Sequence, residues 1–396
     1  MSDASQGASA ADALAGLRVL DFTIMIAGAY GARLLADMGA EVVKVEPPEG
    51  DDMRLRGPLR DGRSAYFGQL NAGKKSLALD LKQHDAIAIA ERLACQADVV
   101  IENFRPGVMD RLGLGAARLR ALNPRLVYAS VSGYGQQGPN AGRPAYAMVV
   151  HAASGFDTVL ARHAGRERPA PGAVFVADVI GGLSAFAAIQ AALVQRARTG
   201  LGQVVDVALM DGMLNLLVND LQSAQFPPSA PRPTYGPVRA SDGDLLVAPL
   251  TARNFEALRD VTGLPVLRED PRFATLASRS ANWHALMTEL EAWTRPRSVA
   301  QCIAALEAAG VPCAGYAEPG DALRDPHLLA RGVFTRVEDA AGAFTGVNPP
   351  WRMSGTRAAL GPRVPEIGAD GDAVLASWLD LDSAECARLR ARGVLR

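Results

Sequence analysis

The 396-residue sequence is poor in the residues that hold metals and disulfides. Its four cysteines lie far apart and form no Cys-x-x-Cys pair, and none of its five histidines falls at the spacing of a metal site. We therefore expect reduced thiols that serve as packing residues, and no metal site.

The sequence also lacks an excess of charge of either sign and a long apolar run. Its net charge is -1, which gives no electrostatic case for a nucleic-acid or membrane partner. The most apolar stretch, residues 181–194, is shorter than the ~18 residues of a membrane span. Residues 1–13 lack the charged and apolar layout of a signal peptide. These absences predict a soluble, cytoplasmic protein.

Three common signatures of nucleotide-binding proteins and hydrolases are absent or incomplete. Only Gly28 and Gly31 follow the first expected strand, so the Gly-x-Gly-x-x-Gly pattern of NAD binding is missing. No Gly-x-Ser-x-Gly elbow supplies a hydrolase nucleophile. Residues 68–76 approach a P-loop, but Lys75 stands where Ser or Thr would bind Mg²⁺, and a strand is expected to follow. The glycine and two lysines of this segment suit a phosphate; a solvated turn is the alternative.

The apolar patterning alternates between short strands and helices, which predicts an α/β fold with a mostly parallel sheet. Prolines crowd residues 227–233, and a stretch rich in turns follows to about residue 330, with helices near 254–262 and 281–294. This change predicts a second, smaller domain. The expected strands are residues 17–22, 41–45, 76–80, 98–101, 125–130 and 203–209, and the expected helices include 28–38, 85–95 and 383–392.

Asp178 stands at the start of a helix of small residues that we expect to reach about Arg198. A carboxylate there meets the positive end of the helix dipole and free backbone N–H groups. Gly181 and Gly182 allow another backbone or a ligand to come close. This setting suits a partly buried carboxylate that stays ionised, as a carboxylate nucleophile must. The alternative is an aspartate that only caps the helix.

Two loops follow expected strands at the edge where open α/β sheets bind ligands. In the first, Phe104 could stack on an adenine, and Arg105 or Arg111 could reach phosphates. The second, residues 132–139, is rich in glycine. His151 lies on an apolar run, which is more typical of a packed histidine than of a base, although its pKa range allows either role.

Several segments together resemble the class III CoA-transferase family, which includes formyl-CoA transferase, carnitine CoA-transferase and 2-methylacyl-CoA racemase. The resemblance covers nearly the whole chain, and the combination is specific. The matching segments are residues 14–21, 35–51, 101–113, 177–183, 198–206, 242–243, 310–312, 331–334, 348–354 and 393–395.

The resemblance implies a large Rossmann-like α/β domain, a smaller α+β domain, and a homodimer of two chains threaded as interlocked rings. In this scheme residues 14–225 begin the CoA-binding domain, 226–330 form the smaller domain, and 331–396 return to the large one. The family's nucleophile falls on Asp178. Its CoA-binding positions fall on Gly28, Ala29, Lys44, Lys75, Asn103, Phe104, Arg111 and Arg143.

The resemblance also implies a reaction in which CoA moves from an acyl-CoA donor to a carboxylic acid through an Asp178–CoA thioester. CoA thioesters are then substrates, and no cofactor is expected. Because the family frequently uses such acids, the resemblance implies succinyl-CoA as the donor and a small dicarboxylic acid as the acceptor, and Arg143 and Arg239 could hold a second carboxylate. Aromatic residues are only 6% of the sequence, which gives little support for a bulky aromatic acceptor.

An acyl-CoA racemase or epimerase and a non-catalytic acyl-CoA-binding protein remain alternatives. The racemase branch carries a His-Asp pair where this sequence has Tyr146-Ala147, which argues against racemisation unless His151 substitutes.

Overall fold

The computed structural model describes residues 12–228 and 233–396 and divides them into two compact units. The larger unit holds the chain up to Thr158, Ala170–Leu217 and Pro326–Arg396, and the smaller holds Val159–Pro169 and Val218–Asp325. The domain limits expected from the sequence stay a prediction. Pro231, one of the prolines of the expected crossing, lies outside the described residues.

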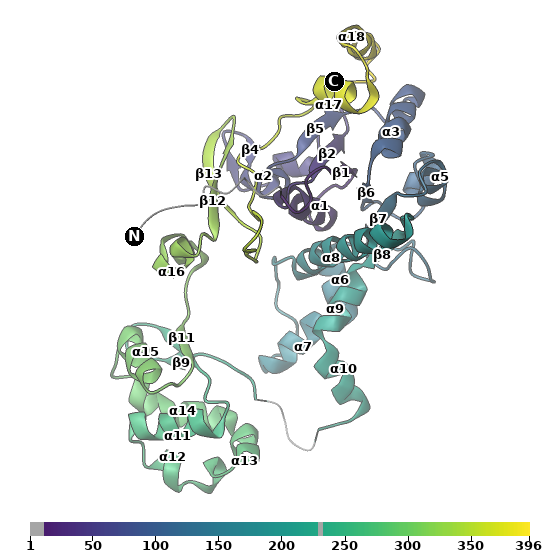
Figure 1. Ribbon diagram of the computed structural model, residues 1–396. Coiled ribbons are helices and arrows are strands. Elements are labelled where there is room, and N and C mark those ends of the chain that lie inside the picture. The colour runs from purple at the N-terminus through teal and green to yellow at the C-terminus, as the bar shows by residue number, and fades with distance from the viewer. Residues whose placement is uncertain (1–11, 229–232) are drawn as a thin grey trace. The chain divides into compact units, whose positions relative to one another are not determined.

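A six-stranded parallel sheet forms the centre of the larger unit (Figure 1). The sheet confirms the predicted α/β class, and its strands lie within a few residues of the predicted ones. The strands, in spatial order, are β5 (Lys75–Ala78), β2 (Glu41–Glu46), β1 (Arg18–Asp21), β6 (Val99–Glu102), β7 (Val127–Ser132) and β8 (Val204–Ala208).

Helices cover both faces of this sheet. The remaining elements of the larger unit are α1 (Ala27–Asp37), α2 (Ala65–Asn71), α3 (His84–Gln96), α4 (Val108–Arg111), α5 (Ala116–Leu122), α6 (Ala147–Ser154), α8 (Val176–Thr199), α9 (Leu209–Leu216), α16 (Pro326–Ala330), α17 (Gly371–Leu379) and α18 (Ser383–Ala391), with the hairpins β3 (Leu59–Arg60)–β4 (Arg63–Ser64) and β12 (Phe334–Asp339)–β13 (Gly342–Val347). Helix α7 (Phe156–His163) crosses from the larger unit into the smaller one.

Neighbouring residues along each strand enter opposite cores, because side chains alternate across a sheet. Val19 and Val99 pack with α1 and α8, whereas Leu20 and Val100 pack with α3 and α17. Both faces are therefore buried, which explains why the strands read as continuous apolar runs in the sequence.

Helices α1 and α8 pack in unusually close contact through glycines. A Cβ added to Gly182 would lie 2.7 Å from the carbonyl oxygen of Ala27, and one added to Gly31 would lie 3.0 Å from the carbonyl oxygen of Gly182. Of the paired glycines predicted to admit a backbone or a ligand, Gly182 admits the backbone of α1, whereas Gly181 admits the side chain of Leu209. The contact with α1 holds the start of α8 beside the turn between β1 and α1.

Helix α8 matches the helix predicted to reach about Arg198, but its apolar run is longer than predicted. It spans 24 residues and is apolar enough to cross a membrane by length and composition alone. It packs instead against α1 and the sheet, with 33% of its most apolar window buried. We describe it as a partly buried core helix.

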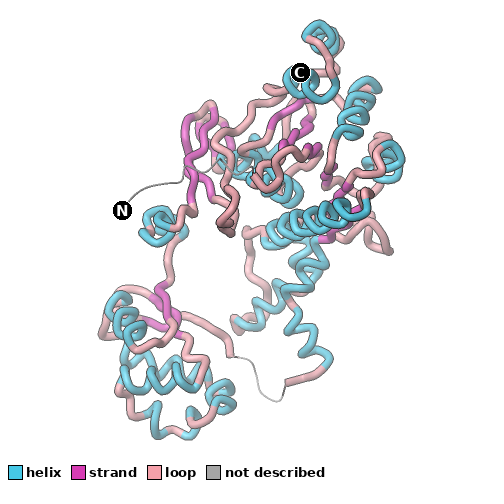
Figure 2. Tube along the Cα trace, in the orientation of Figure 1, coloured by secondary structure: helices cyan, strands magenta, loops and turns pink. Residues whose placement is uncertain are grey.

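The smaller unit combines a three-stranded antiparallel sheet with helices (Figure 2). Phe255, Trp283 and Leu290 belong to its separate apolar core. Its elements are β9 (Val238–Arg239), β10 (Asp244–Val247), β11 (Cys313–Gly315), α10 (Val218–Gln225), α11 (Ala252–Thr262), α12 (Val266–Glu269), α13 (Leu276–Ala281), α14 (Trp283–Thr294) and α15 (Val299–Ala308).

Candidate active site

The turn after β1 and the loop after β6 are joined by hydrogen bonds. They lie where the strand order reverses, because the chain continues from β1 to β2 on one side and from β6 to β7 on the other. The side chain of Asn103 accepts a hydrogen bond from the N–H of Ile24 and donates one to its carbonyl oxygen, both at 2.8 Å. Gly28 fits beneath this clamp, because a Cβ there would lie 2.5 Å from Cγ2 of Thr23. The amide of Asn103, predicted to contact CoA, is therefore used to hold the turn.

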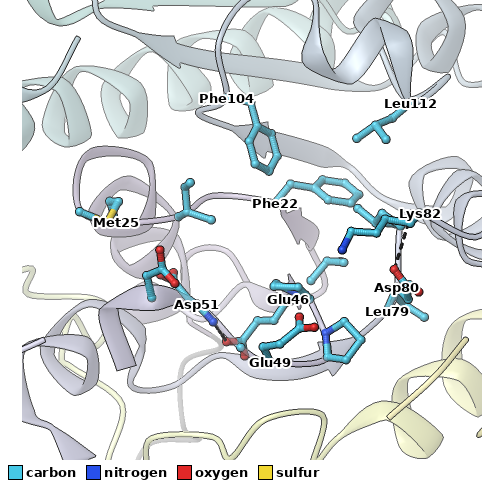
Figure 3. Close-up of a pocket in the computed structure, with 17 residues that line it drawn as sticks. Phe22, Met25, Glu46, Glu49, Asp51, Leu79, Asp80, Lys82, Phe104 and Leu112 are labelled. Atoms are coloured by element: carbon cyan, nitrogen blue, oxygen red, sulfur yellow. Dashed lines mark hydrogen bonds between the residues drawn. The ribbon is translucent and has the colours of Figure 1, made fainter. Parts of the chain in front are cut away.

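A pocket of about 390 Å³ opens at the carboxyl ends of β1, β2, β5 and β6 (Figure 3). Phe22 and Phe104 lie on one side, Glu46 and Glu49 on the other, and Lys82 lies at one end. Open α/β sheets bind ligands at this edge, at the point where the strand order reverses. The pocket thus lies where the sequence analysis expected a ligand, and it includes Phe104.

The floor of the pocket is made by a buried ionic cluster. Lys44 is fully buried; its Nζ lies 2.9 Å from Oδ2 of Asp51 and donates to the carbonyl oxygen of Thr23. Although burial opposes its charged form, Asp51 and neighbouring carboxylates raise the pKa of Lys44. Hydrogen bonds from Arg54 and Ser76 outweigh burial and lower the pKa of Glu46 to about 2. Lys44 is thus poised to fix the floor rather than to touch a phosphate.

Lys74 and Lys75 lie in the segment that approaches a P-loop. They match neither the predicted phosphate site nor the alternative, a solvated turn. Lys74 is buried and pairs with Asp21 at 2.8 Å, and it also donates to the carbonyl oxygen of Ala29. Lys75 pairs with Glu41 at the first residues of β5 and β2. Because these strands are parallel, Lys75 lies at the amino edge of the sheet, opposite the pocket. The structure does not bring Lys75 to the predicted phosphate site.

The exposed cations near the pocket are Lys82, Arg105 and Arg111. None of the three makes an ion pair with any residue that the structure describes. Lys82 lines the pocket directly and was not singled out from the sequence. The sequence feature that could have identified Lys82 is its position just after the carboxyl end of β5. Arg143 lies elsewhere, in the exposed loop before α6, with its guanidinium 5.8 Å from the ring centroid of Tyr134.

Asp178 lies in the first turn of α8 and is partly buried. It makes no ion pair with any residue among 12–228 and 233–396, and burial raises its pKa to about 6. The helix start was expected to favour the charged form; desolvation outweighs that effect here. The N–H of Asp178 itself has no hydrogen-bond acceptor among the described residues.

The surroundings of Asp178 explain this desolvation. Met25, Tyr66 and Phe175 join one apolar cluster with Ile26 and Ala29 of the turn into α1. Burial raises the pKa of Tyr66 in α2, and the Asp178 carboxylate raises it further. Tyr66 was not recognised from the sequence, because α2 was not predicted.

Met25 connects the two parts of the site. It belongs to the apolar cluster beside Asp178 and also lines the pocket. Its backbone has φ 61°, a left-handed conformation that costs a non-glycine residue roughly 1–2 kcal/mol. Such strain concentrates at functional sites. The turn after β1 therefore contacts both the pocket and the apolar cluster that includes Phe175, three residues before Asp178.

Comparison with known proteins identifies the family of this chain. The model of CoA-transferase family III matches residues 14–371. This chain belongs to that family. It is 38% identical to the acetyl-CoA:oxalate CoA-transferase of Acetobacter aceti, over 84% of this chain and 87% of the relative. It is 34% identical to the succinate–glutarate CoA-transferase of Agrobacterium fabrum, over 92% of this chain and 95% of the relative.

The fold agrees with the same family. The crystal structure of a CAIB/BAIF family protein from Brucella suis matches with a TM-score of 0.79 and 34% identity, over 92% of this chain and 99% of that chain. The protein is therefore a class III CoA-transferase, as the resemblance of its sequence implied.

Proposed function

We propose that this CoA-transferase moves CoA from an acyl-CoA donor to a small carboxylic acid, with Asp178 as the covalent nucleophile. The observation that carries the proposal is the environment of the Asp178 carboxylate. Asp178 is partly buried, has no ion-pair partner among the described residues, and lies beside a turn that also lines the apolar pocket. A carboxylate without a cationic partner keeps its lone pairs available for attack.

The reaction divides into two exchanges at the Asp178 carboxyl group. An oxygen of Asp178 attacks the donor thioester carbon, the C–S bond breaks, and a mixed anhydride and CoA thiolate form. The thiolate attacks the Asp178 carbonyl carbon, the anhydride C–O bond breaks, and the donor acid leaves as its carboxylate. The acceptor carboxylate then reverses these two steps and takes CoA. No proton is consumed, and no external energy source is needed.

The environment of Asp178 suits this chemistry. Its pKa of about 6 leaves it mostly ionised at neutral pH, while burial removes the water that would hydrolyse an anhydride. The free N–H of Asp178 at the start of α8 is a candidate donor to the oxyanions, and such a donor contributes about 3 kcal/mol in other acyl-transfer sites.

We assign the adenosine part of CoA to the pocket at the carboxyl ends of the strands. Phe22 and Phe104 offer aromatic surfaces to the base. The carboxylates of Glu49 and Asp52 can accept hydrogen bonds from an amino group or a ribose hydroxyl. Lys82, Arg105 and Arg111 are the nearby cations available to phosphates.

We propose a small dicarboxylate as the acceptor and succinyl-CoA as a donor. The named substrates of the two relatives support this class, because oxalate, succinate and glutarate are all dicarboxylates. Arg143 is an exposed cation of the larger unit that could hold a second carboxylate. Arg239 is a second exposed cation, but it belongs to the smaller unit and pairs with Asp244.

Racemisation receives no support from the position of His151. A racemase needs a base that can take the α-proton of an acyl-CoA. The Nε2 atom of His151 instead accepts a hydrogen bond from the N–H of Ala177 at 3.0 Å. His151, the only residue suggested as a substitute for the missing His-Asp pair, is therefore hydrogen-bonded to the backbone instead.

The test is exchange of isotopically labelled acid into acyl-CoA. Wild-type protein with succinyl-CoA and labelled succinate should exchange label, and donor alone should leave CoA on the peptide that contains Asp178. Asp178→Asn should bind acyl-CoA and lose exchange, whereas Asp211→Asn, in the first turn of α9, should keep it. Near-normal exchange by Asp178→Asn would overturn the mechanism. Acceptance of only bulky or cationic acids would overturn the dicarboxylate assignment alone.

A further inference from the structure

Helix α8 begins without the side chain that usually caps a helix. The residue before its first turn is Phe175, whose side chain offers no hydrogen-bond acceptor to the backbone. The first N–H groups of a helix need acceptors, and Ser, Thr, Asp or Asn at this position normally supplies one to the second or third N–H. In α8 the second residue is Ala177, and Asp178 follows it.

The missing acceptor comes from another helix. His151 of α6 lies 26 residues earlier in the chain, and its Nε2 accepts the N–H of Ala177 at 3.0 Å. The ring is 2% exposed and packs against Phe156 with the centroids 5.2 Å apart. The imidazole is thus held by packing on one side and by the backbone of α8 on the other.

We propose that His151 is a positioning residue for the nucleophile: its neutral imidazole caps α8 and fixes the first turn on which Asp178 stands. This inference rests on the proposed role of Asp178. An imidazole nitrogen accepts a hydrogen bond only when it carries no proton, so His151 holds its proton on Nδ1. Burial lowers the pKa of His151, against a smaller opposing effect of Asp157, which favours this neutral form.

The geometry matters for catalysis because Asp178 adjoins the capped residue. If the N–H of Ala177 loses its acceptor, the first turn of α8 can fray, and the carboxylate no longer meets the thioester carbon at one angle. A misplacement of about 1 Å can cost on the order of 100-fold in rate. The pocket assigned to adenosine does not include His151, so acyl-CoA affinity should change little.

Three variants test the proposal by separating kcat from KM. His151→Leu keeps the bulk and removes the acceptor, and we expect kcat to fall at least tenfold with KM for succinyl-CoA within about twofold. His151→Gln offers an amide oxygen to the same N–H and should recover most of kcat. His163→Leu, which changes an exposed histidine of α7, should leave both constants unchanged.

Covalent trapping locates the defect. With donor alone, His151→Leu should form the Asp178–CoA thioester more slowly by the same factor as kcat. The proposal is overturned if His151→Leu keeps kcat within twofold, or if the Gln variant is as impaired as the Leu variant. Should the Leu variant not fold, His151→Asn, whose shorter amide does not reach Ala177, replaces it in that comparison. Turnover by Asp178→Asn, measured in parallel, would overturn the proposed function; an inactive Asp178→Asn with a normal His151→Leu would overturn this inference alone.

Discussion

At the scale of the residue, the burial of Asp178, our proposed nucleophile, has a cost to stability. Burial raises its pKa from an ordinary value of 3.8 to about 6, so the folded protein holds this proton more tightly than the unfolded chain does. The ionised carboxylate therefore destabilises the fold at neutral pH. This cost is absent below about pH 3 and complete above pH 6.

Asp178→Asn should therefore stabilise the protein while abolishing turnover. We expect a gain in the free energy of unfolding of about 2 kcal/mol at pH 7.5, because one pKa unit corresponds to ~1.4 kcal/mol and partial exposure reduces the effect. The gain should disappear near about pH 3, where both states are protonated. Urea unfolding at the two pH values measures it; an equal gain at both would show that ionisation of Asp178 is not the cause.

The same pKa predicts the acid limb of the activity profile. Attack on the thioester requires ionised Asp178, so kcat/KM for acyl-CoA should fall as pH drops below about 6 and approach tenfold per unit. Steady-state rates from pH 5 to 8 measure this limb. A profile that stays flat down to pH 5 would contradict the raised pKa.

The lysines of the sheet edges offer a second residue-scale test. Lys82 lines the pocket, whereas Lys75 lies at the opposite edge and pairs with Glu41. Lys82→Ala should raise KM for acyl-CoA about 10- to 100-fold with kcat little changed, the range expected for one charged contact. Lys75→Ala is the matched control and should change KM less than twofold. The reverse ranking would restore the original assignment of Lys75 to a phosphate.

At the scale of the element, the contact between α1 and α8 controls the site. Both the turn at Gly28 and the carboxylate of Asp178 belong to these two helices, and Gly31 and Gly182 allow their backbones to touch. A methyl group at this contact cannot be absorbed by a flexible side chain, because it meets the carbonyl oxygen of Ala27. The separation of the helices is therefore set by the absence of two Cβ atoms.

Gly182→Ala should push α1 away from α8. We expect a loss of about 1–3 kcal/mol in the free energy of unfolding, the usual cost of overpacking, together with a reduced kcat. Gly172→Ala is the control: it lies in the loop before α8, and a Cβ there meets nothing within 4 Å. Thermal unfolding and steady-state kinetics report both effects. A Gly182→Ala protein as stable and active as the control would show that the helices can separate freely.

At the scale of the whole molecule, we propose a dimer of interlocked chains. The larger unit leaves apolar side chains of α8 uncovered, with Val179 43% and Val194 54% exposed. Only 33% of the most apolar window of α8 is buried, so this helix is a candidate surface for a second chain. The C-terminal segment also returns to the larger unit after the smaller one, a chain path that two copies can thread.

An interlocked dimer should not exchange subunits without unfolding, because folding and assembly are inseparable in such a dimer. Chains with two different tags should form mixed dimers when coexpressed but not when the purified proteins are mixed. Sedimentation at nanomolar concentration should show the dimer alone. A folded, active monomer or rapid exchange on mixing would refute the interlocked arrangement, although the transferase assignment would stand.

The sequence by itself determined the elements whose signals are local. The strands of the sheet were recognisable because both of their faces are buried, which makes each a short apolar run. Asp178 was recognisable because a carboxylate before a small-residue helix is a local pattern, and Phe104 because it follows a strand in an α/β order. Family resemblance added the reaction type to these residues.

Only the tertiary structure decided what each polar side chain contacts. Lys74 found a partner in Asp21, 53 residues away, and Lys75 lies at the far edge of the sheet from the pocket. The Asp178 carboxylate raises the pKa of Tyr66 in α2, and His151 of α6 accepts the N–H of Ala177. Each of these contacts depends on the packing of elements distant in sequence. The spacing of apolar residues along the chain carries no information about which distant polar groups meet. The burial and the partner of each polar side chain are set only when the helices pack on the sheet.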